Sequence, residues 1–201
     1  MKNLVHMMTD RILIVASASP RRHQLIAGLD IPYNVEISGH TEEVYDTSVN
    51  INSVPLYLAK MKSFYFGREL KEEEILLTAD TLVICEGEIL GKPSNREEAT
   101  KMLMKLSGKA HNVITGVYLR SIKGEKGFSA STVVYFKTLS DKEIDYYVEH
   151  YKPYDKAGAY GAQEWIGYIA IEKIEGSYFN VMGLPVQKLY NELQIFIDQG
   201  Y

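Results

Sequence analysis

Short apolar runs alternate with helically periodic segments along most of this chain. Residues 11–16 form a short β-rich apolar run, and residues 19–28 follow with the punctuation of a helix: Ser19 as the cap, Pro20 at the first position and Gly28 at the exit. Alternating or continuously apolar positions predict further strands. These lie at residues 33–38, 75–85, 88–90, 111–122, 128–139 and 168–174.

Four more segments predict helices, at residues 53–70, 94–108, 141–151 and 185–197. Capping boxes, in which a Ser cap is followed three residues later by Glu, open the second and the third of these at Ser94 and Ser140. The segment 153–167 is rich in Gly and Tyr, and we expect it to be a long functional loop with short helical pieces.

Strands and helices interleave in this pattern, which favours the α/β class. The strands at 111–122 and 128–139 are joined by a short Gly-containing and Lys-containing turn, which predicts a hairpin. Because a hairpin pairs antiparallel strands, we expect a mixed sheet flanked by helices rather than an all-parallel one. Residues 1–10 are expected to form a flexible extension, and residues 11–201 a single domain with two lobes.

Composition excludes several classes of protein. The 201 residues are 46% hydrophobic, which disfavours disorder, and 22 Lys and Arg stand against 26 Asp and Glu. Interspersed charges of net −4 give no basic face for duplex nucleic acid, although a few clustered cations would suffice for one small anionic ligand. No apolar run approaches the length of a membrane span, so no membrane partner is expected.

Cysteine and histidine usage adds two expectations. Cys85 is the only cysteine and stands in an apolar run, so it predicts a buried side chain in a protein of the reducing cytoplasm. The five histidines show no metal-ligand spacing, which disfavours a zinc site. Any cation is expected to be Mg²⁺ or Mn²⁺, held by carboxylates and by phosphates of the substrate.

Arg21 and Arg22 stand in the first turn of their predicted helix, where the helix dipole disfavours cations. Together with helix amide groups and the hydroxyls of Ser17 and Ser19, they would make a binding site for phosphate. The alternative is a pair of solvated arginines that bear a small dipole penalty. The residues alone leave both interpretations open.

Asp80 interrupts the apolar strand at 75–85. A carboxylate at such a position must point into a wet cleft or be paired inside the protein. The position favours a role as metal ligand or general base over that of an ordinary surface acid. Its candidate cationic partners are Lys60, Lys62 and Lys92, and at most one of the first two serves the site, since residues two apart on a helix face different ways.

Eight motifs, taken together and in order, resemble a known family. They are ASASPRR at 16–22, LAKMK at 58–62, ADTLV at 79–83, LGKP at 90–93, LSG at 106–108, HNVITGV at 111–117, DKAGAY at 155–160 and GSYFNVMGLP at 176–185. In this respect the chain, from residue 11 to 197, is similar to the Maf family of nucleoside triphosphate pyrophosphatases. The resemblance implies an elongated inosine-triphosphatase-like α/β fold with two lobes around a central cleft, commonly dimeric.

The implied reaction is hydrolysis of a nucleoside triphosphate to the monophosphate and pyrophosphate with a divalent cation. Position by position, the resemblance assigns the phosphate-binding residues to Ser17, Arg21 and Arg22, and the catalytic lysines to Lys62 and Lys92. It assigns Asp80 as the proton acceptor and Glu43 as a second catalytic acid, which helps Asp80 through a cation or directly, and both acids are the expected metal ligands. A shift of one residue would exchange Glu43 for Glu42, and the sequence does not decide whether Asp80 takes the proton or only holds the metal.

Two further positions point to a branch of that family. The branch that acts on dTTP and UTP has Thr after the strand aspartate and Gln in the late Ala-Tyr-Gly segment, and this chain has Thr81 and Gln163 there. A Gln amide offers one donor and one acceptor, which matches the O4 and N3–H edge of uracil and thymine. The alternative function is a nucleotide-binding regulator of cell division or septum formation in which hydrolysis is incidental.

Overall fold

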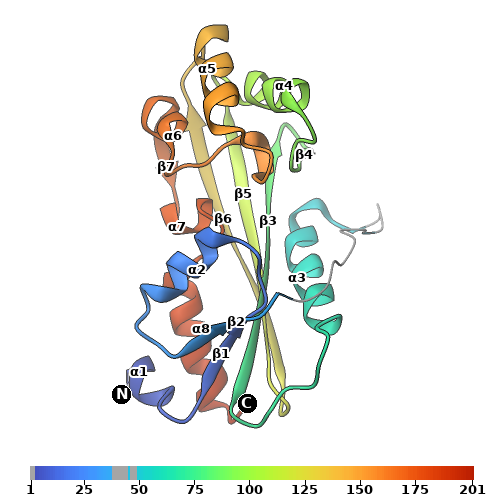
Figure 1. Cartoon of the computed structure of the whole chain (residues 1–201), viewed down its shortest axis with the longest axis vertical. Helices are drawn as coiled ribbons and strands as arrows, with labels where there is room; N and C mark the ends of the chain where they lie inside the picture. The colour runs from blue at the N-terminus through green and yellow to red at the C-terminus, as the bar shows by residue number, and fades with distance from the viewer. Residues whose placement is uncertain (1–2, 38–44, 46–48) are drawn as a thin grey trace. The chain divides into compact units, whose positions relative to one another are not determined.

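The computed structural model describes residues 3–37, 45 and 49–201. In chain order its elements are α1 Leu4–Met7, β1 Ile12–Val15, α2 Pro20–Ala27, β2 Tyr33–Val35, the 3₁₀ turn η1 Ile51–Ser53, α3 Val54–Phe64, β3 Glu74–Cys85, β4 Glu88–Leu90, α4 Arg96–Leu106, β5 Ala110–Arg120, β6 Glu125–Phe136, α5 Asp141–Tyr151, η2 Ala157–Ala159, α6 Trp165–Ala170, β7 Ile171–Glu175, α7 Tyr178–Val181 and α8 Val186–Asp198 (Figure 1).

The described strands form one seven-stranded mixed sheet in the order β2-β1-β3-β5-β6-β7, with β4 also paired to β3. β1 runs parallel to both β2 and β3, whereas β4 is antiparallel to β3 and β7 is antiparallel to β6. The prediction of a mixed α/β sheet flanked by helices is therefore confirmed. The central cleft stays a prediction.

The chain divides into two compact units. Unit 1 comprises Met1–Asp80, Thr115–Ala130 and Gly183–Tyr201, and unit 2 comprises Thr81–Ile114 and Ser131–Met182. Strands β3, β5 and β6 each contribute residues to both units. The catalytic candidate Asp80 is the last residue of its unit-1 segment.

The N-terminal residues of unit 1 differ from the flexible extension that the sequence predicted. Residues 4–7 form helix α1, which packs beside α8 (Figure 1). The side chains of Leu4 and Met8 are fully buried, and the Leu4 N–H donates to the hydroxyl of Tyr190. Burial of two large apolar side chains offsets the entropy lost on ordering this short segment.

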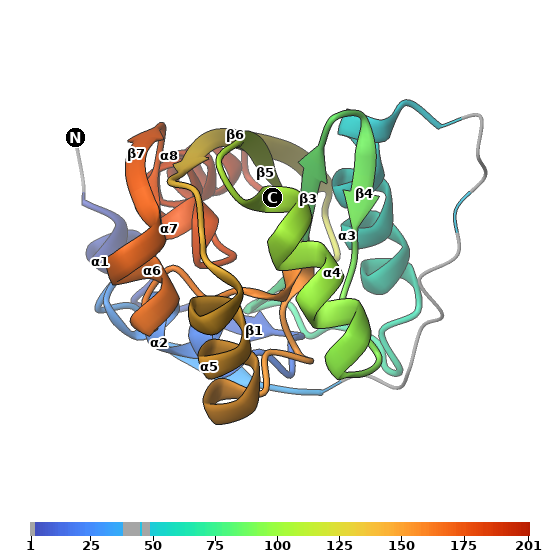
Figure 2. The ribbon, with the colours of Figure 1, turned by 90° about the horizontal axis from the view of Figure 1, so that it is seen from above.

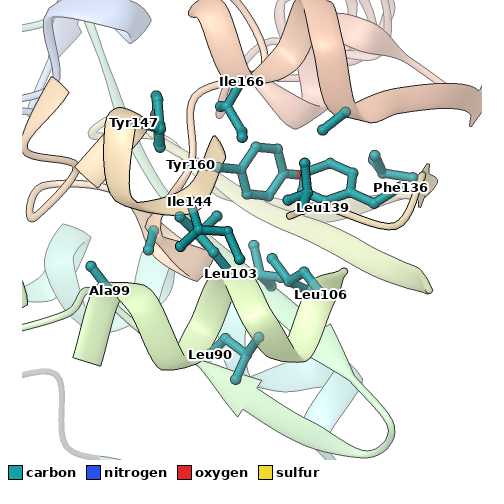
Figure 3. Packing of buried hydrophobic residues seen from close by; sticks show 14 of the residues in the cluster. Leu90, Ala99, Leu103, Leu106, Phe136, Leu139, Ile144, Tyr147, Tyr160 and Ile166 are labelled. Carbon is teal, nitrogen blue, oxygen red and sulfur yellow. The ribbon is translucent and has the colours of Figure 1, made fainter. Parts of the chain in front are cut away.

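Unit 2 has its own apolar core. Helices α4 and α5 pack against each other (Figure 2), and their inner faces contribute Leu103, Leu106, Ile144 and Tyr147. Figure 3 shows these side chains close to those of the later segments, among them Tyr160 and Ile166. The short helical pieces predicted for the segment 153–167 are present as η2 and the start of α6, and the segment contributes Ala159, Tyr160, Ala162 and Ile166 to the core of unit 2.

Several local predictions need correction. The strand expected at 128–139 spans Glu125–Phe136. The strand expected at 168–174 begins only at Ile171, because Ile166 and Ala170, four residues apart and both buried, place the preceding residues in helix α6. The capping box predicted at Ser94 does not form. Asn95 is the N-cap of α4 and its side chain accepts from the Glu98 N–H, while the backbone N–H of Ser94 donates to the Glu98 carboxylate. The helix expected to reach residue 70 ends at Phe64.

Candidate active site

Two polar residues of β3 face helix α3. The Thr78 hydroxyl donates to the carbonyl of Ala59 at 2.7 Å. Two residues along the strand, Asp80 accepts a hydrogen bond from the ammonium of Lys62, one helical turn after Ala59. Alternate residues of a strand share a face, and so do helix residues three apart. The Thr78–Ala59 and Asp80–Lys62 contacts can therefore form together when α3 packs along β3. Asp80 is only 5% exposed, and pairing with Lys62 offsets the cost of burying its carboxylate.

Strand β5 fixes the position of α3. At the start of the helix, a Cβ on Gly116 would lie only 2.2 Å from the amide nitrogen of Leu56, so only glycine permits this approach. At its end, the Arg120 guanidinium donates to the hydroxyl of Ser63 at 3.0 Å and to its carbonyl at 2.6 Å. Sequence reasoning did not assign roles to Gly116 or Arg120, although a glycine inside a strand is itself a signal of close backbone approach.

Lys60 and Lys62 point to different surroundings. The Lys60 ammonium lies 5.5 Å from the ring centre of Phe64 and 5.8 Å from that of Tyr118, which are cation–π contacts. Lys62 instead pairs with Asp80. The structure therefore brings together the lysine and the aspartate that the resemblance selected.

The turn between β1 and α2 brings Ser17 and Arg22 together. The Ser17 hydroxyl accepts from the Ser19 N–H at 3.2 Å and from Arg22 at 3.3 Å, and its carbonyl accepts from the His23 ring at 2.6 Å. The Arg22 Nε donates to the carbonyl of Gly183 at 2.9 Å. These bonds hold the hydroxyl and the guanidinium side by side at the helix start.

The N-terminus of α2 has the predicted features of an anion site. Ser19 is the N-cap and Pro20 follows it, but the Ser19 side chain makes no capping hydrogen bond. Arg21 and Arg22 are half-buried in the first turn, where no acidic residue stands. Amide groups and two cations at a helix start favour a bound anion.

Thr81, Lys92 and Gln163 belong to unit 2. Thr81 is half-buried in β3, and Lys92 is exposed in the turn after β4. That turn is held by a 3.0 Å hydrogen bond from the Gly158 N–H to the carbonyl of Gly91. Gln163 is half-buried, and its Oε1 atom is buried and has no hydrogen-bond partner among the described residues.

The acidic candidates of the segment 38–48 lie outside the described residues, so neither Glu43 nor Glu42 has a structural position here. Within the described residues, no group of three or more His, Cys, Asp or Glu side chains is arranged to hold a metal ion.

Comparison with known proteins decides the family. The model of the family described as "Maf-like protein" matches residues 12–196. The chain belongs to the Maf family. The match includes every described candidate site residue, from Ser17 to Gln163.

Curated Maf relatives are similar to this chain over nearly their whole length. A protein named dTTP/UTP pyrophosphatase from Porphyromonas gingivalis is 51% identical over 186 residues, which cover 92% of this chain and 94% of that protein. Proteins of the same name from Phocaeicola vulgatus and Christiangramia forsetii are 51% and 45% identical, and they cover 90% and 97% of this chain and 94% and 99% of their own lengths.

Among solved structures, a HAM1 protein from Coxiella burnetii superposes with a TM-score of 0.51, covering 92% of this chain and 99% of that chain. Its sequence identity is 12%, so this likeness concerns the fold alone. Among the described residues, none of the helices has the length and apolar character needed to cross a membrane.

Proposed function

We propose that this Maf protein hydrolyses dTTP and UTP to the nucleoside monophosphate and pyrophosphate. The observation that carries the proposal is the identity of 45–51%, over at least 90% of the chain, to relatives named dTTP/UTP pyrophosphatase. The Lys62–Asp80 pair and the Ser17–Arg22 contact support it, because they supply a buried carboxylate and an anion-binding helix start.

The phosphate-binding part of the proposal rests on Ser17, Arg21, Arg22 and the N-terminus of α2. Developing negative charge on the pyrophosphate leaving group requires positioned donors and cations. The arginines supply fork-shaped guanidinium donors, and the helix start supplies amide groups. The ammonium groups of Lys62 and Lys92 would help to neutralise the negative charge that develops on the pyrophosphate.

Asp80 is the proposed proton acceptor for the water that attacks the α-phosphorus. The carboxylate is buried in β3, and its Oδ1 atom is oriented by the ammonium of Lys62. A held carboxylate can accept the proton without reorganising in the transition state. Lys62 then serves the reaction by positioning Asp80 and by offsetting its charge.

We also propose that a divalent cation, Mg²⁺ or Mn²⁺, is shared between the protein and the substrate. Mg²⁺ prefers oxygen ligands and commonly uses one or two carboxylates together with phosphates. Asp80 would supply one carboxylate, and Glu43, outside the described residues, would supply another. When bound, the cation would neutralise phosphate charge and lower the pKa of bound water.

Gln163 and Thr81 are the proposed base-recognition residues. The Oε1 acceptor of Gln163 has no hydrogen-bond partner in the part of the chain that the structure describes, and it suits a ring that presents an N–H donor, as uracil and thymine do at N3. CTP presents an unprotonated N3 and an amino group at position 4, the reverse pattern. A mismatch that leaves buried polar groups unpaired costs roughly 1–3 kcal/mol per group.

The cytoplasmic location and the homodimer are also proposals. Cys85 is a buried free thiol, and burial raises its pKa, which is typical of a structural rather than a reactive cysteine. Light scattering of the purified protein measures the oligomeric state directly, and a monomer at micromolar concentration would contradict the homodimer.

The test of the proposed function is pyrophosphate release by the purified protein, with Mg²⁺, across dTTP, UTP, CTP, dCTP, GTP and ATP. We expect dTTP and UTP to give kcat/KM values at least about tenfold above the others, the scale of one mismatched polar group. Equal activity on UTP, CTP and GTP would overturn the assignment. Tight nucleotide binding without turnover would instead support the alternative function, a nucleotide-binding regulator of cell division or septum formation.

A further inference from the structure

A buried polar network adjoins Gln163 in unit 2. The Glu164 carboxylate accepts a hydrogen bond from the Tyr147 hydroxyl of α5 and pairs with the Lys156 ammonium at 3.1 Å. The Tyr147 hydroxyl also accepts from the Gly161 N–H at 3.1 Å. Tyr147 is fully buried, the Lys156 side chain is 9% exposed and the Glu164 side chain is 21% exposed. The Lys156 ammonium also pairs with the exposed Asp155 carboxylate at 2.7 Å. Three polar side chains from two segments thus converge beside one residue of the proposed substrate site.

This network fixes the chain on both sides of Gln163. Two residues before it, the Gly161 amide is bound to Tyr147; directly after it, Glu164 is bound through its side chain. A Cβ on Gly167 would lie 1.9 Å from the carbonyl oxygen of Ala162, so the start of α6 packs directly on the residue before Gln163. The backbone at Gln163 therefore has little freedom to move.

Stability alone does not require such a network. Burying an ammonium and a carboxylate carries a large desolvation cost, and apolar side chains of similar volume often serve the fold as well. Apolar packing is already present around Tyr147, as Figure 3 shows for Ile144, Tyr160 and Ile166. Costly polar groups inside an otherwise apolar core tend to mark function.

The need for fixation comes from the symmetry of the glutamine amide. A carboxamide can present either its donor or its acceptor to a base, so its position against the base decides whether it suits uracil or cytosine. We propose that Glu164, held by Tyr147 and Lys156, is a positioning residue that fixes the backbone at Gln163 and so places the Gln163 carboxamide where Oε1 meets the N3–H of uracil or thymine. This inference rests on the proposed function, because it assumes that Gln163 contacts the base.

The principal test compares Glu164→Gln and Tyr147→Phe with the unmodified protein, with UTP and CTP as substrates. Glu164→Gln preserves side-chain volume but removes the negative charge that pairs with Lys156. Tyr147→Phe removes the hydroxyl and with it the hydrogen bonds to the Glu164 carboxylate and the Gly161 N–H. We expect the ratio of kcat/KM for UTP over CTP to fall about tenfold in each, about 1.4 kcal/mol, with kcat for UTP within about twofold. Glu172→Gln, an exposed acid on β7 of the same unit, is the matched control and should leave the ratio unchanged.

A double-mutant cycle with Gln163→Ala shows whether Glu164 acts through Gln163. We expect Glu164→Gln to cause no further loss of the UTP/CTP ratio once Gln163 is alanine. If Glu164 has only a structural role, Glu164→Gln will lower kcat/KM for UTP and for CTP by the same factor. An unchanged UTP/CTP ratio of this kind would overturn the inference. If one variant fails to fold, as judged by thermal unfolding, the other decides.

The same measurements separate the inference from the proposed function. If Gln163→Ala itself leaves the UTP/CTP ratio unchanged, the role of Gln163 in base recognition is wrong. If Gln163→Ala lowers the ratio while the folded Glu164 and Tyr147 variants keep it, base recognition stands and the positioning role of Glu164 is wrong.

Discussion

The ammonium of Lys62 on α3 donates a hydrogen bond to the carboxylate of Asp80 on β3. Thr78, two residues earlier on the same face of the strand, binds the carbonyl of Ala59 on the same helix. The orientation of Asp80 is therefore set by how α3 packs on β3, so residues that position α3 also affect the proposed general base.

We expect Asp80→Asn to lower pyrophosphate release from UTP by about a hundredfold or more, because the amide cannot accept the proton from water. Steady-state kinetics with UTP and Mg²⁺ measures the loss, and circular dichroism establishes that the variant is folded. Asp198→Asn, at the exposed end of α8, is the matched control. A folded Asp80→Asn protein with nearly full turnover would show that Asp80 has a structural role only.

Lys62→Met and Lys60→Met should differ, although they remove the same charge from the same helix. Lys62→Met leaves the buried Asp80 carboxylate without its ammonium, and we expect activity to fall at least about tenfold. Lys60→Met loses only cation–π contacts worth about 0.5–1 kcal/mol, so its activity should stay within about twofold. Parallel kinetics of the two variants is the measurement, and equal defects would contradict the assignment of Lys62 to the site.

Gly116→Ala should destabilise the protein by roughly 3 kcal/mol or more, because its Cβ would collide with backbone atoms that cannot rotate away. The added carbon would meet the backbone of Pro55 and Leu56 at 2.2 to 2.4 Å. Urea unfolding measures the change. Gly67→Ala, where an added Cβ meets nothing within 4 Å, is the control. Equal unfolding midpoints for the two variants would show that α3 can shift away from β5 at little cost.

His111 on β5 should make stability depend on pH. It is 2% exposed, and burial lowers its pKa from 6.5 to about 4. Between these values the unfolded chain binds a proton that the folded protein excludes, so the free energy of unfolding falls as pH drops from about 6.5 through about 4. The limiting loss is about 3 kcal/mol.

Urea unfolding at several pH values checks the His111 prediction against two variants. His111→Gln should lose this component of the pH dependence, at some cost in stability at neutral pH, since the bond between His111 and the Tyr160 hydroxyl changes. His150→Gln, an exposed histidine on α5, should keep it. An unaltered pH dependence in His111→Gln would assign the effect to other groups.

The sequence by itself determined the local elements and the family. Strong local signals were sufficient to predict the bounds of some elements. The capping box at Ser140 opens α5 as predicted, and strand β4 and helix α5 have their predicted bounds. The resemblance in eight motifs predicted the Maf family, because those residues lie in a fixed order along the chain. Asp80 could be singled out because a carboxylate in an apolar strand is anomalous wherever the strand lies.

Only the tertiary structure decided which distant residues meet. Charge and local spacing do not distinguish Lys60 from Lys62, and the family resemblance selected Lys62 without a physical reason. The packing of α3 on β3 supplies that reason, because it pairs Lys62 with Asp80 and places Lys60 against two aromatic rings. The partners of Glu164 stand 17 and 8 residues away and carry no local pattern that links them. Local propensity depends on neighbours within a turn or two, whereas these contacts follow from how helices and strands pack, which no short window of sequence contains.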